Sequence, residues 1–131
     1  MALLNSILVI DDSKTIRASV QSMMRKHSIE VHTAEDGYLA MTAILANRPD
    51  LVLVDALMPR INGYQVIRLL KSNPNYMALP VVMLTGKNRI IDKERAFLCG
   101  ADAFLPKPFT ESDMLSTLRQ FALLPTAGDF A

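Results

Sequence analysis

Polar residues stand at the far ends of four short apolar runs, and their types suit phosphoryl chemistry. They are Asp11, Asp12, Asp55, Thr85 and Lys107. Carboxylate oxygens are the ligands that Mg²⁺ prefers, and an ammonium group attracts phosphate oxygens. A hydroxyl can add a hydrogen bond to the same phosphoryl group. These residues would form a magnesium-assisted phosphoryl site if the fold brought them together.

The four apolar runs have the composition of strands that are buried on both faces. They cover residues 7–10, 51–54, 81–84 and 103–105. Each is short, rich in β-branched or aromatic residues and closed by a turn signal. In an open parallel α/β sheet, ligands bind outside the carboxyl ends of the strands. That edge of the sheet is therefore where the polar residues are expected to gather.

Strand and helix patterns alternate five times along the chain. A further short strand is expected near residues 30–34, and helical patterns follow the strands, for example over 37–47 and 90–98. Repeated strand–helix–strand units predict a parallel sheet with helices on both faces. The fold class is therefore α/β, with a doubly wound sheet of five parallel strands.

Helix ends are also marked in the sequence. Ser13 is available to cap the first helix, and Gly100 suits a left-handed position after the fourth. The last helix opens at Thr110 with a variant of the capping box. We expect it to carry Phe121 and to end at Pro125.

Length and composition predict one domain over residues 1–124 with a short tail over 125–131, and no separate DNA-binding or catalytic output domain. The formal net charge of +1 gives no electrostatic reason to expect nucleic acid as a partner. No apolar stretch is long enough for a membrane span, and the N-terminus lacks the pattern of a signal peptide. The single cysteine, Cys99, permits no internal disulfide. The expected location is the cytoplasm.

The residue types also suggest how the chemistry would be divided among them. Asp11, Asp12 and Asp55 would repel one another unless a cation lay between them. With Mg²⁺ bound, one carboxylate can act as the nucleophile, and Asp55 is the choice because it ends a central strand before a flexible loop. Taken singly, Asp12 could be a helix cap, Lys107 a solvated charge and Thr85 a turn residue.

Four short motifs in fixed order make the chain resemble the receiver domain of two-component response regulators. They are Asp11-Asp12, Asp55-Ala56-Leu57-Met58-Pro59 with Gly63 after it, Thr85-Gly86, and Lys107-Pro108-Phe109. Their spacings are similar to those of the single-domain regulators of chemotaxis and twitching motility. The resemblance covers residues 6–123 and implies a (βα)5 flavodoxin-like, three-layer sandwich.

The resemblance implies a role for each matching residue. Asp55 would be the phosphoacceptor, and Mg²⁺ would be held by Asp11, Asp12, Asp55 and the backbone carbonyl of Leu57. The phosphoryl contacts would come from Thr85, Gly86 and Lys107. Thr85 and Phe104 would form the switch, and the bond between Lys107 and Pro108 would be cis.

The resemblance also implies partners and a type of activity. A sensor histidine kinase or a phosphotransfer protein would supply the phosphoryl group. A downstream protein would bind the face formed by the fourth helix, fifth strand and fifth helix. Such a domain is a signalling phosphoacceptor that promotes its own phosphorylation and dephosphorylation, and motility or chemotaxis is the expected output.

Some positions depart from the common pattern of receiver domains. Phe104 stands where Tyr is frequent, and Leu57 and Lys87 occupy variable positions that tune the phosphoryl lifetime in similar proteins.

The alternative is a Mg²⁺-dependent phosphohydrolase with an aspartyl nucleophile. Enzymes of the haloacid dehalogenase type place an acid two residues after the nucleophile, and Leu57 cannot transfer a proton there. A degenerate receiver used only for docking would lack the complete acidic set.

Overall fold

The structure, a computed structural model, describes residues 1–86 and 89–125. Lys87 and positions 126–131 of the expected tail lie outside the described residues. The described part of the chain forms one sheet with the strand order β2-β1-β3-β4-β5, in which all neighbours are parallel. The strands are β1 (Ser6–Ile10), β2 (Glu30–Ala34), β3 (Leu51–Asp55), β4 (Val81–Thr85) and β5 (Ala103–Pro106). The predicted doubly wound parallel sheet is confirmed.

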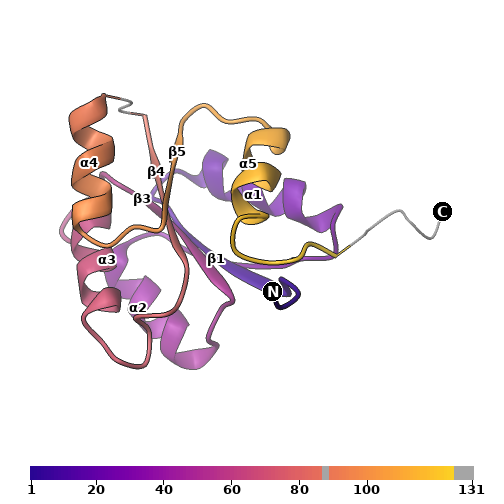
Figure 1. Cartoon of the computed structure of the whole chain (residues 1–131), viewed down its shortest axis with the longest axis horizontal. Coiled ribbons are helices and arrows are strands. Elements are labelled where there is room, and N and C mark those ends of the chain that lie inside the picture. The colour runs from indigo at the N-terminus through magenta and orange to yellow at the C-terminus, as the bar shows by residue number, and fades with distance from the viewer. Residues whose placement is uncertain (87–88, 126–131) are drawn as a thin grey trace.

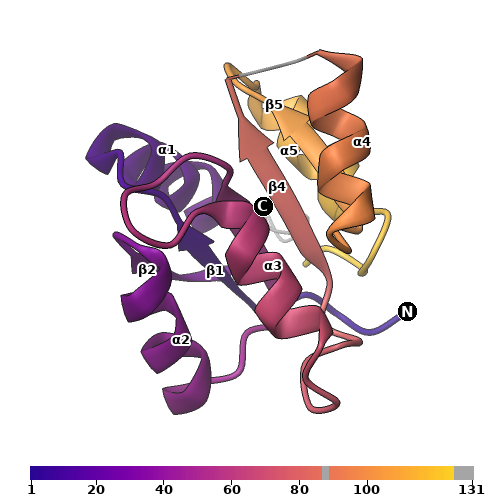
Figure 2. The same ribbon diagram turned by 90° about the vertical axis from the view of Figure 1, so that its left-hand side faces the viewer.

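Helices cover both faces of this sheet (Figure 1). They are α1 (Lys14–Arg25), α2 (Gly37–Ala46), α3 (Gly63–Lys71), α4 (Ile90–Leu98) and α5 (Glu111–Leu118). Helices α1 and α5 lie on one face, and α2, α3 and α4 lie on the other, as Figures 1 and 2 show from two directions. No helix of the described residues is long and apolar enough to cross a membrane.

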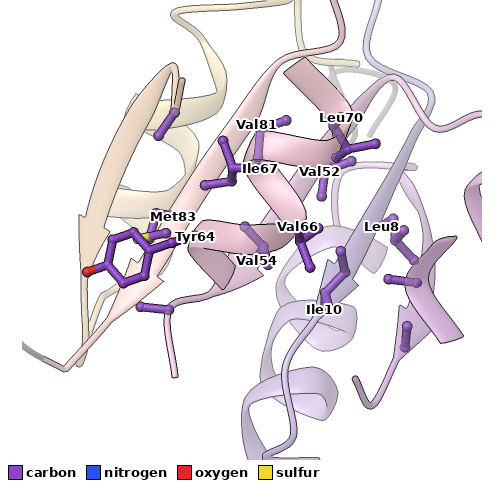
Figure 3. Close-up of a cluster of buried hydrophobic side chains, with 14 of the residues drawn as sticks. Leu8, Ile10, Val52, Val54, Tyr64, Val66, Ile67, Leu70, Val81 and Met83 are labelled. Atoms are coloured by element: carbon purple, nitrogen blue, oxygen red, sulfur yellow. The ribbon is translucent and has the colours of Figure 1, made fainter. Parts of the chain in front are cut away.

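Alternate residues of the central strands feed two hydrophobic clusters, one on each face of the sheet. The cluster under α3 is drawn in Figure 3, where strand and helix side chains interlock. Its members include Leu8, Ile10, Val52, Val54, Val66, Ile67 and Leu70. The opposite cluster includes Ile7, Val9, Leu51 and Leu53 beneath α1 and α5. Every residue of β3 and β4 is buried, which explains why these strands read as continuous apolar runs.

The predicted helix-end signals act as expected. The Ser13 side chain accepts a hydrogen bond from the Ile16 N–H at 3.3 Å. Thr110 and Asp113 form a reciprocal capping box at the start of α5, with distances of 2.9 and 3.0 Å. Gly100 has φ of 108° at the end of α4, a conformation that side chains rarely adopt.

The prediction for the end of the last helix is wrong. Helix α5 ends at Leu118, well before Pro125, and Phe121 lies in the turn that follows. The chain then pairs with the N-terminal segment: the Leu4 N–H donates to the Leu123 carbonyl at 2.7 Å, and the Leu123 N–H donates to the Ala2 carbonyl at 2.9 Å. Because Leu123 uses its backbone in this bridge, the helix cannot continue through it.

Candidate functional site

The parallel register places the predicted site residues at one edge of the sheet. Ile10 lies beside Val54, and Thr85 lies beside Pro106. Asp11, Asp55, Thr85 and Lys107 therefore leave the sheet at the same end. This edge also contains the point between β1 and β3 where the strand order reverses, which is the usual ligand position in such sheets.

Three carboxylates meet at this edge. Oxygens of Asp11, Asp12 and Asp55 all lie within 4.8 Å of one another. Asp11 is fully buried and Asp55 is 7% exposed, whereas Asp12 is exposed to solvent. A group of carboxylate oxygens that is open on one side has the donor chemistry of a Mg²⁺ site that also admits a phosphoryl oxygen.

Lys107 provides the positive charge within this cluster. Its Nζ lies 2.7 Å from Oδ2 of Asp11 and 3.1 Å from Oδ1 of Asp55, and its side chain is only 18% exposed. Lys107 therefore bridges two carboxylates that would otherwise repel each other. One ammonium against three carboxylates leaves an excess of negative charge that a further cation can balance.

The pKa of Asp55 reflects its burial and the excess of negative charge around it. Burial, and then the charge of Asp11, raise the pKa of Asp55 to about 6, although Lys107 acts in the opposite direction. For Lys107, burial works against the charged form, but its hydrogen bonds and attraction to Asp11 and Asp55 outweigh it and raise its pKa. Lys107 is therefore charged at neutral pH, and Asp55 is mostly ionised but easier to protonate than an ordinary aspartate.

Asp11 is held by several groups of its own segment. Its Oδ1 accepts a hydrogen bond from the Ser13 N–H at 2.9 Å, and its own N–H donates to the Ala34 carbonyl at 3.1 Å. The Arg17 guanidinium donates to the Asp11 carbonyl at 2.7 Å. The sequence analysis missed Arg17, although its place one turn beyond the Ser13 cap directs it back toward this loop.

Gly63 fixes the loop that follows Asp55. A Cβ at this position would lie 2.2 Å from the Asp55 carbonyl oxygen and 2.9 Å from the Cα of Ala56, so no side chain can fit. The Gly63 N–H donates to the Ala56 carbonyl at 3.0 Å. Helix α3 thus begins directly against the backbone that carries Asp55, which explains why glycine stands in the motif.

The remaining predicted residues surround the cluster. Thr85 is 2% exposed, and its carbonyl accepts a hydrogen bond from the Lys107 N–H at 2.7 Å, while Gly86 is exposed. Phe104 is half-buried and packs against the hydrophobic cluster under α3. The peptide bond between Lys107 and Pro108 is cis. Leu57 is 53% exposed, so its apolar side chain faces solvent beside the site.

The doubly wound sheet with an acidic cluster and a lysine at its carboxyl edge defines a receiver-type phosphoacceptor domain. The chain belongs to this family, because the sequence-family model of the response regulator receiver domain matches residues 7–119. Receiver domains are signalling phosphoacceptors rather than ordinary enzymes. The chain therefore functions in two-component signalling, and the phosphohydrolase alternative has no support from its family.

Among its relatives is Protein PilG of Pseudomonas aeruginosa, which is 38% identical over 86% of this chain and 84% of that protein. Response regulator MprA of Mycobacterium sp. (strain KMS) is 36% identical over 86% of this chain. The chain spans about half the length of the MprA relatives, matching 48% of this one. The chemotaxis protein CheY4 of Vibrio cholerae has a solved structure that covers 90% of this chain and 98% of its own, with a TM-score of 0.84 and 30% identity.

Proposed function

We propose that Asp55 accepts a phosphoryl group from a histidine kinase or a phosphotransfer protein, assisted by Mg²⁺, and that this switches the binding of a downstream protein. The observation that supports this proposal most directly is the meeting of three carboxylates within 4.8 Å, with Lys107 bridging two of them. In that arrangement Asp55 has both a cation for the incoming phosphoryl group and neighbours that can hold a metal.

The metal would be held by the carboxylates of Asp11, Asp12 and Asp55 and by the backbone carbonyl of Leu57. All of these donors are oxygens, as Mg²⁺ requires, and the excess of negative charge over Lys107 favours a divalent cation. When bound, Mg²⁺ would neutralise charge on the phosphoryl oxygens and draw them toward the nucleophile.

Phosphoryl transfer would use the ionised form of Asp55. One carboxylate oxygen forms a bond to phosphorus while the bond from phosphorus to the donor's imidazole nitrogen breaks, and that nitrogen takes up a proton. Lys107 keeps its contact with Asp11 and offers its remaining donors to a phosphoryl oxygen, with Thr85 and Gly86 as the other contacts. By favouring attack and later hydrolysis at the same phosphorus, the chain promotes both its phosphorylation and its dephosphorylation.

The test is treatment of the full chain with a small acyl phosphate and Mg²⁺, followed by intact-mass and peptide-mass measurement. A single phosphoryl adduct is expected on Asp55. The substitution Asp55→Asn should abolish it, whereas the control Asp113→Asn on α5 should keep it. An adduct that persists in Asp55→Asn would place the acceptor elsewhere and overturn the assignment.

The switch would follow from the new charge on Asp55. Thr85 turns inward to hydrogen-bond the phosphoryl group, the Phe104 ring moves into the space behind β4, and the surface of α4, β5 and α5 changes shape. Couplings of this kind amount to about 1–3 kcal/mol, which is roughly a 5- to 150-fold change in partner affinity. The similarity to PilG and to a chemotaxis protein supports motility or chemotaxis in the cytoplasm as the output.

This coupling can be separated from phosphorylation itself. Thr85→Ala keeps Asp55 and the other carboxylates, so it should still accept the phosphoryl group. Its affinity for the downstream protein should respond much less to an acyl-phosphate mimic than that of the unchanged chain. Equal responses in both proteins would show that the Thr85 hydroxyl does not transmit the signal.

A further inference from the structure

Helix α2 exposes an apolar face without any charge. No Asp, Glu, Lys, Arg or His occurs between Gly37 and Ala46. One side of the helix packs into the core, yet Tyr38, Leu39 and Leu45 on the other side are 71%, 48% and 72% exposed. A surface helix normally carries charged or polar residues on its outer face, and a helix that is apolar all round is normally covered. The face of Tyr38, Leu39, Thr42 and Leu45, called here the α2 face, therefore has the composition of a buried surface.

The other long helices differ from α2 in this respect. Helix α4 exposes several large apolar side chains, but it also carries Lys93 and Glu94 on its exposed side; the apolar ones are Ile90, Ile91, Phe97 and Leu98. Helix α1 exposes Lys14 and Arg25. Figures 1 and 2 place α2 at the periphery, with none of the described elements lying over its outer side. Residues 1–86 and 89–125 therefore do not supply the cover that this helix requires.

The shape of the α2 face suits a second copy of itself. Tyr38, Thr42 and Leu45 follow the spacing of one helical stripe, so the small Thr42 stands at the middle between larger side chains. Two copies related by a two-fold axis through Thr42 would run antiparallel. Leu39 of each copy would then lie against Leu45 of the other, with large and small side chains interlocking as helix packing requires.

The ends of α2 are complementary in charge. The exposed Glu35 stands at its N-terminal end, and the exposed Arg48 stands just past its C-terminal end. Asp36, the N-cap, is already paired with Arg60 at 3.1 Å, so Glu35 supplies the negative charge. In an antiparallel pair, the acidic end of one helix lies beside the basic end of the other, and the two helix dipoles oppose each other favourably. We propose that the α2 face is the interface of a symmetric homodimer of this chain, with two α2 helices packed antiparallel about Thr42.

A hollow beside Tyr38 provides a place for an anchoring side chain. It measures about 200 Å³ and is lined by Asp36, Tyr38, Pro59, Arg60 and Ile61. The antiparallel arrangement brings Leu45 of the second copy to this end of α2. An apolar side chain that fills a pocket of its partner is the kind of residue that contributes most to binding energy.

A lipid surface fits this face less well. Helices that lie in a membrane interface carry Lys or Arg on the polar side, next to the apolar side that enters the lipid. Helix α2 has no cationic residue, and the side opposite its exposed face is buried in the domain core. The uncharged face with acidic and basic ends favours a second copy of this chain.

Sedimentation equilibrium of the full chain over a wide concentration range tests the proposal. The unchanged chain should dimerise reversibly. Leu45→Glu should weaken the dimer by roughly 100-fold, because a symmetric interface carries the new charge twice, and each carboxylate would lose water against Leu39 at the acidic end of the other α2. Leu98→Glu is the matched control, since Leu98 is 88% exposed on α4, and it should leave the dissociation constant unchanged. A chain that stays monomeric, or equal weakening by both variants, would overturn the proposal.

A cross-linking experiment tests the geometry of the same proposal. In a Cys99→Ser background, Thr42→Cys places a thiol at the proposed two-fold axis. Mild oxidation should join two copies through this position, whereas Ser22→Cys on the exposed side of α1 should stay monomeric. Thermal unfolding of each variant shows whether it is folded, so a failure to cross-link in folded Thr42→Cys would contradict the antiparallel arrangement.

Discussion

Each edge of the sheet contains a lysine that is bonded to aspartate, but the charges balance at only one of them. At the edge where the strands begin, Lys71 Nζ lies 2.7 Å from Oδ2 of Asp102 and 2.7 Å from the Leu79 carbonyl oxygen. The same Asp102 oxygen also accepts a hydrogen bond from the Val81 N–H at 2.8 Å. At the edge where the strands end, Lys107 faces three carboxylates. At the first edge one ammonium faces one carboxylate, so this pair is electrically neutral and bonded within the chain; at the second edge the cluster carries an excess of negative charge.

The difference separates a charged cluster whose bonds are completed within the chain from one whose charge is left in excess. Asp102 and Lys71 satisfy each other and the backbone around them, so nothing further has to bind. Asp55 is held at an unfavourable pKa of about 6 by burial and by Asp11, which costs stability. Sites that conflict with the rules of stable packing are the sites where function is expected.

The largest effect is expected at the neutral edge. Asp102→Ala should lower the free energy of unfolding by about 2–4 kcal/mol, because it leaves Lys71, whose side chain is 17% exposed, and the Val81 N–H without their acceptor. Urea unfolding at neutral pH measures this effect. Lys26→Gln is the control: it breaks an ion pair with Glu111 at the surface and should change stability far less. Equal losses of stability in the two variants would show that the Lys71–Asp102 cluster stabilises the fold no more than a surface ion pair does.

At the edge that carries the three carboxylates, a substitution is expected to increase the stability of the fold. Asp55→Asn should raise the free energy of unfolding by about 1–2 kcal/mol at pH 7, because it removes a carboxylate whose ionisation is disfavoured in the folded state. The folded pKa of about 6 lies above the ordinary aspartate value of 3.8, so the folded state binds more protons between these values. The unchanged chain therefore gains stability as the pH falls through this range, and the advantage of Asp55→Asn should disappear near pH 4.

Urea unfolding of both proteins at a series of pH values measures the difference. The measurement is made without divalent cations, since a bound metal would favour the ionised carboxylate. An advantage of Asp55→Asn that grows toward pH 4 would contradict the assigned direction of the pKa.

The sequence predicted which residues meet at the candidate site, but not the contacts that these residues make with one another. Asp11, Asp55, Thr85 and Lys107 could be placed together because parallel strands bring their carboxyl ends to one edge. The bridge from Lys107 to Asp11 and Asp55 could not be predicted, since it depends on side-chain conformations set by tertiary packing. Arg17 was missed for the same reason: its partner is a backbone carbonyl, which no residue type reveals.

The fold was predictable where local signals agreed with the tertiary structure. Burial of β3 and β4 on both faces made them easy to recognise, and the cap at Thr110 has a local hydrogen-bonding cause. The end of α5 was mispredicted because Pro125 offered a plausible stop. The actual stop depends on the bridge between Leu123 and the N-terminal segment, which is distant in sequence.

The effect expected from metal binding depends on concentration and is modest. Mg²⁺ at tenfold excess over its dissociation constant should raise the free energy of unfolding by about 1.4 kcal/mol, because a ligand that binds only the folded state stabilises it by mass action. Asp12→Asn should lose most of this gain. Asp12 is exposed, so its substitution should leave the fold intact without metal. An equal magnesium-dependent gain of stability in both proteins would show that Mg²⁺ does not bind at this cluster.

The bridge between Leu3 and Leu123 has a practical consequence for labelling the molecule. It holds the two ends of the domain side by side, next to the edge where β1 begins and therefore away from Asp55. A fluorescent protein or affinity tag joined before Leu3 or after Leu123 would leave from the same corner of the molecule. Reporters attached at either end should thus leave the edge that carries Asp55 accessible.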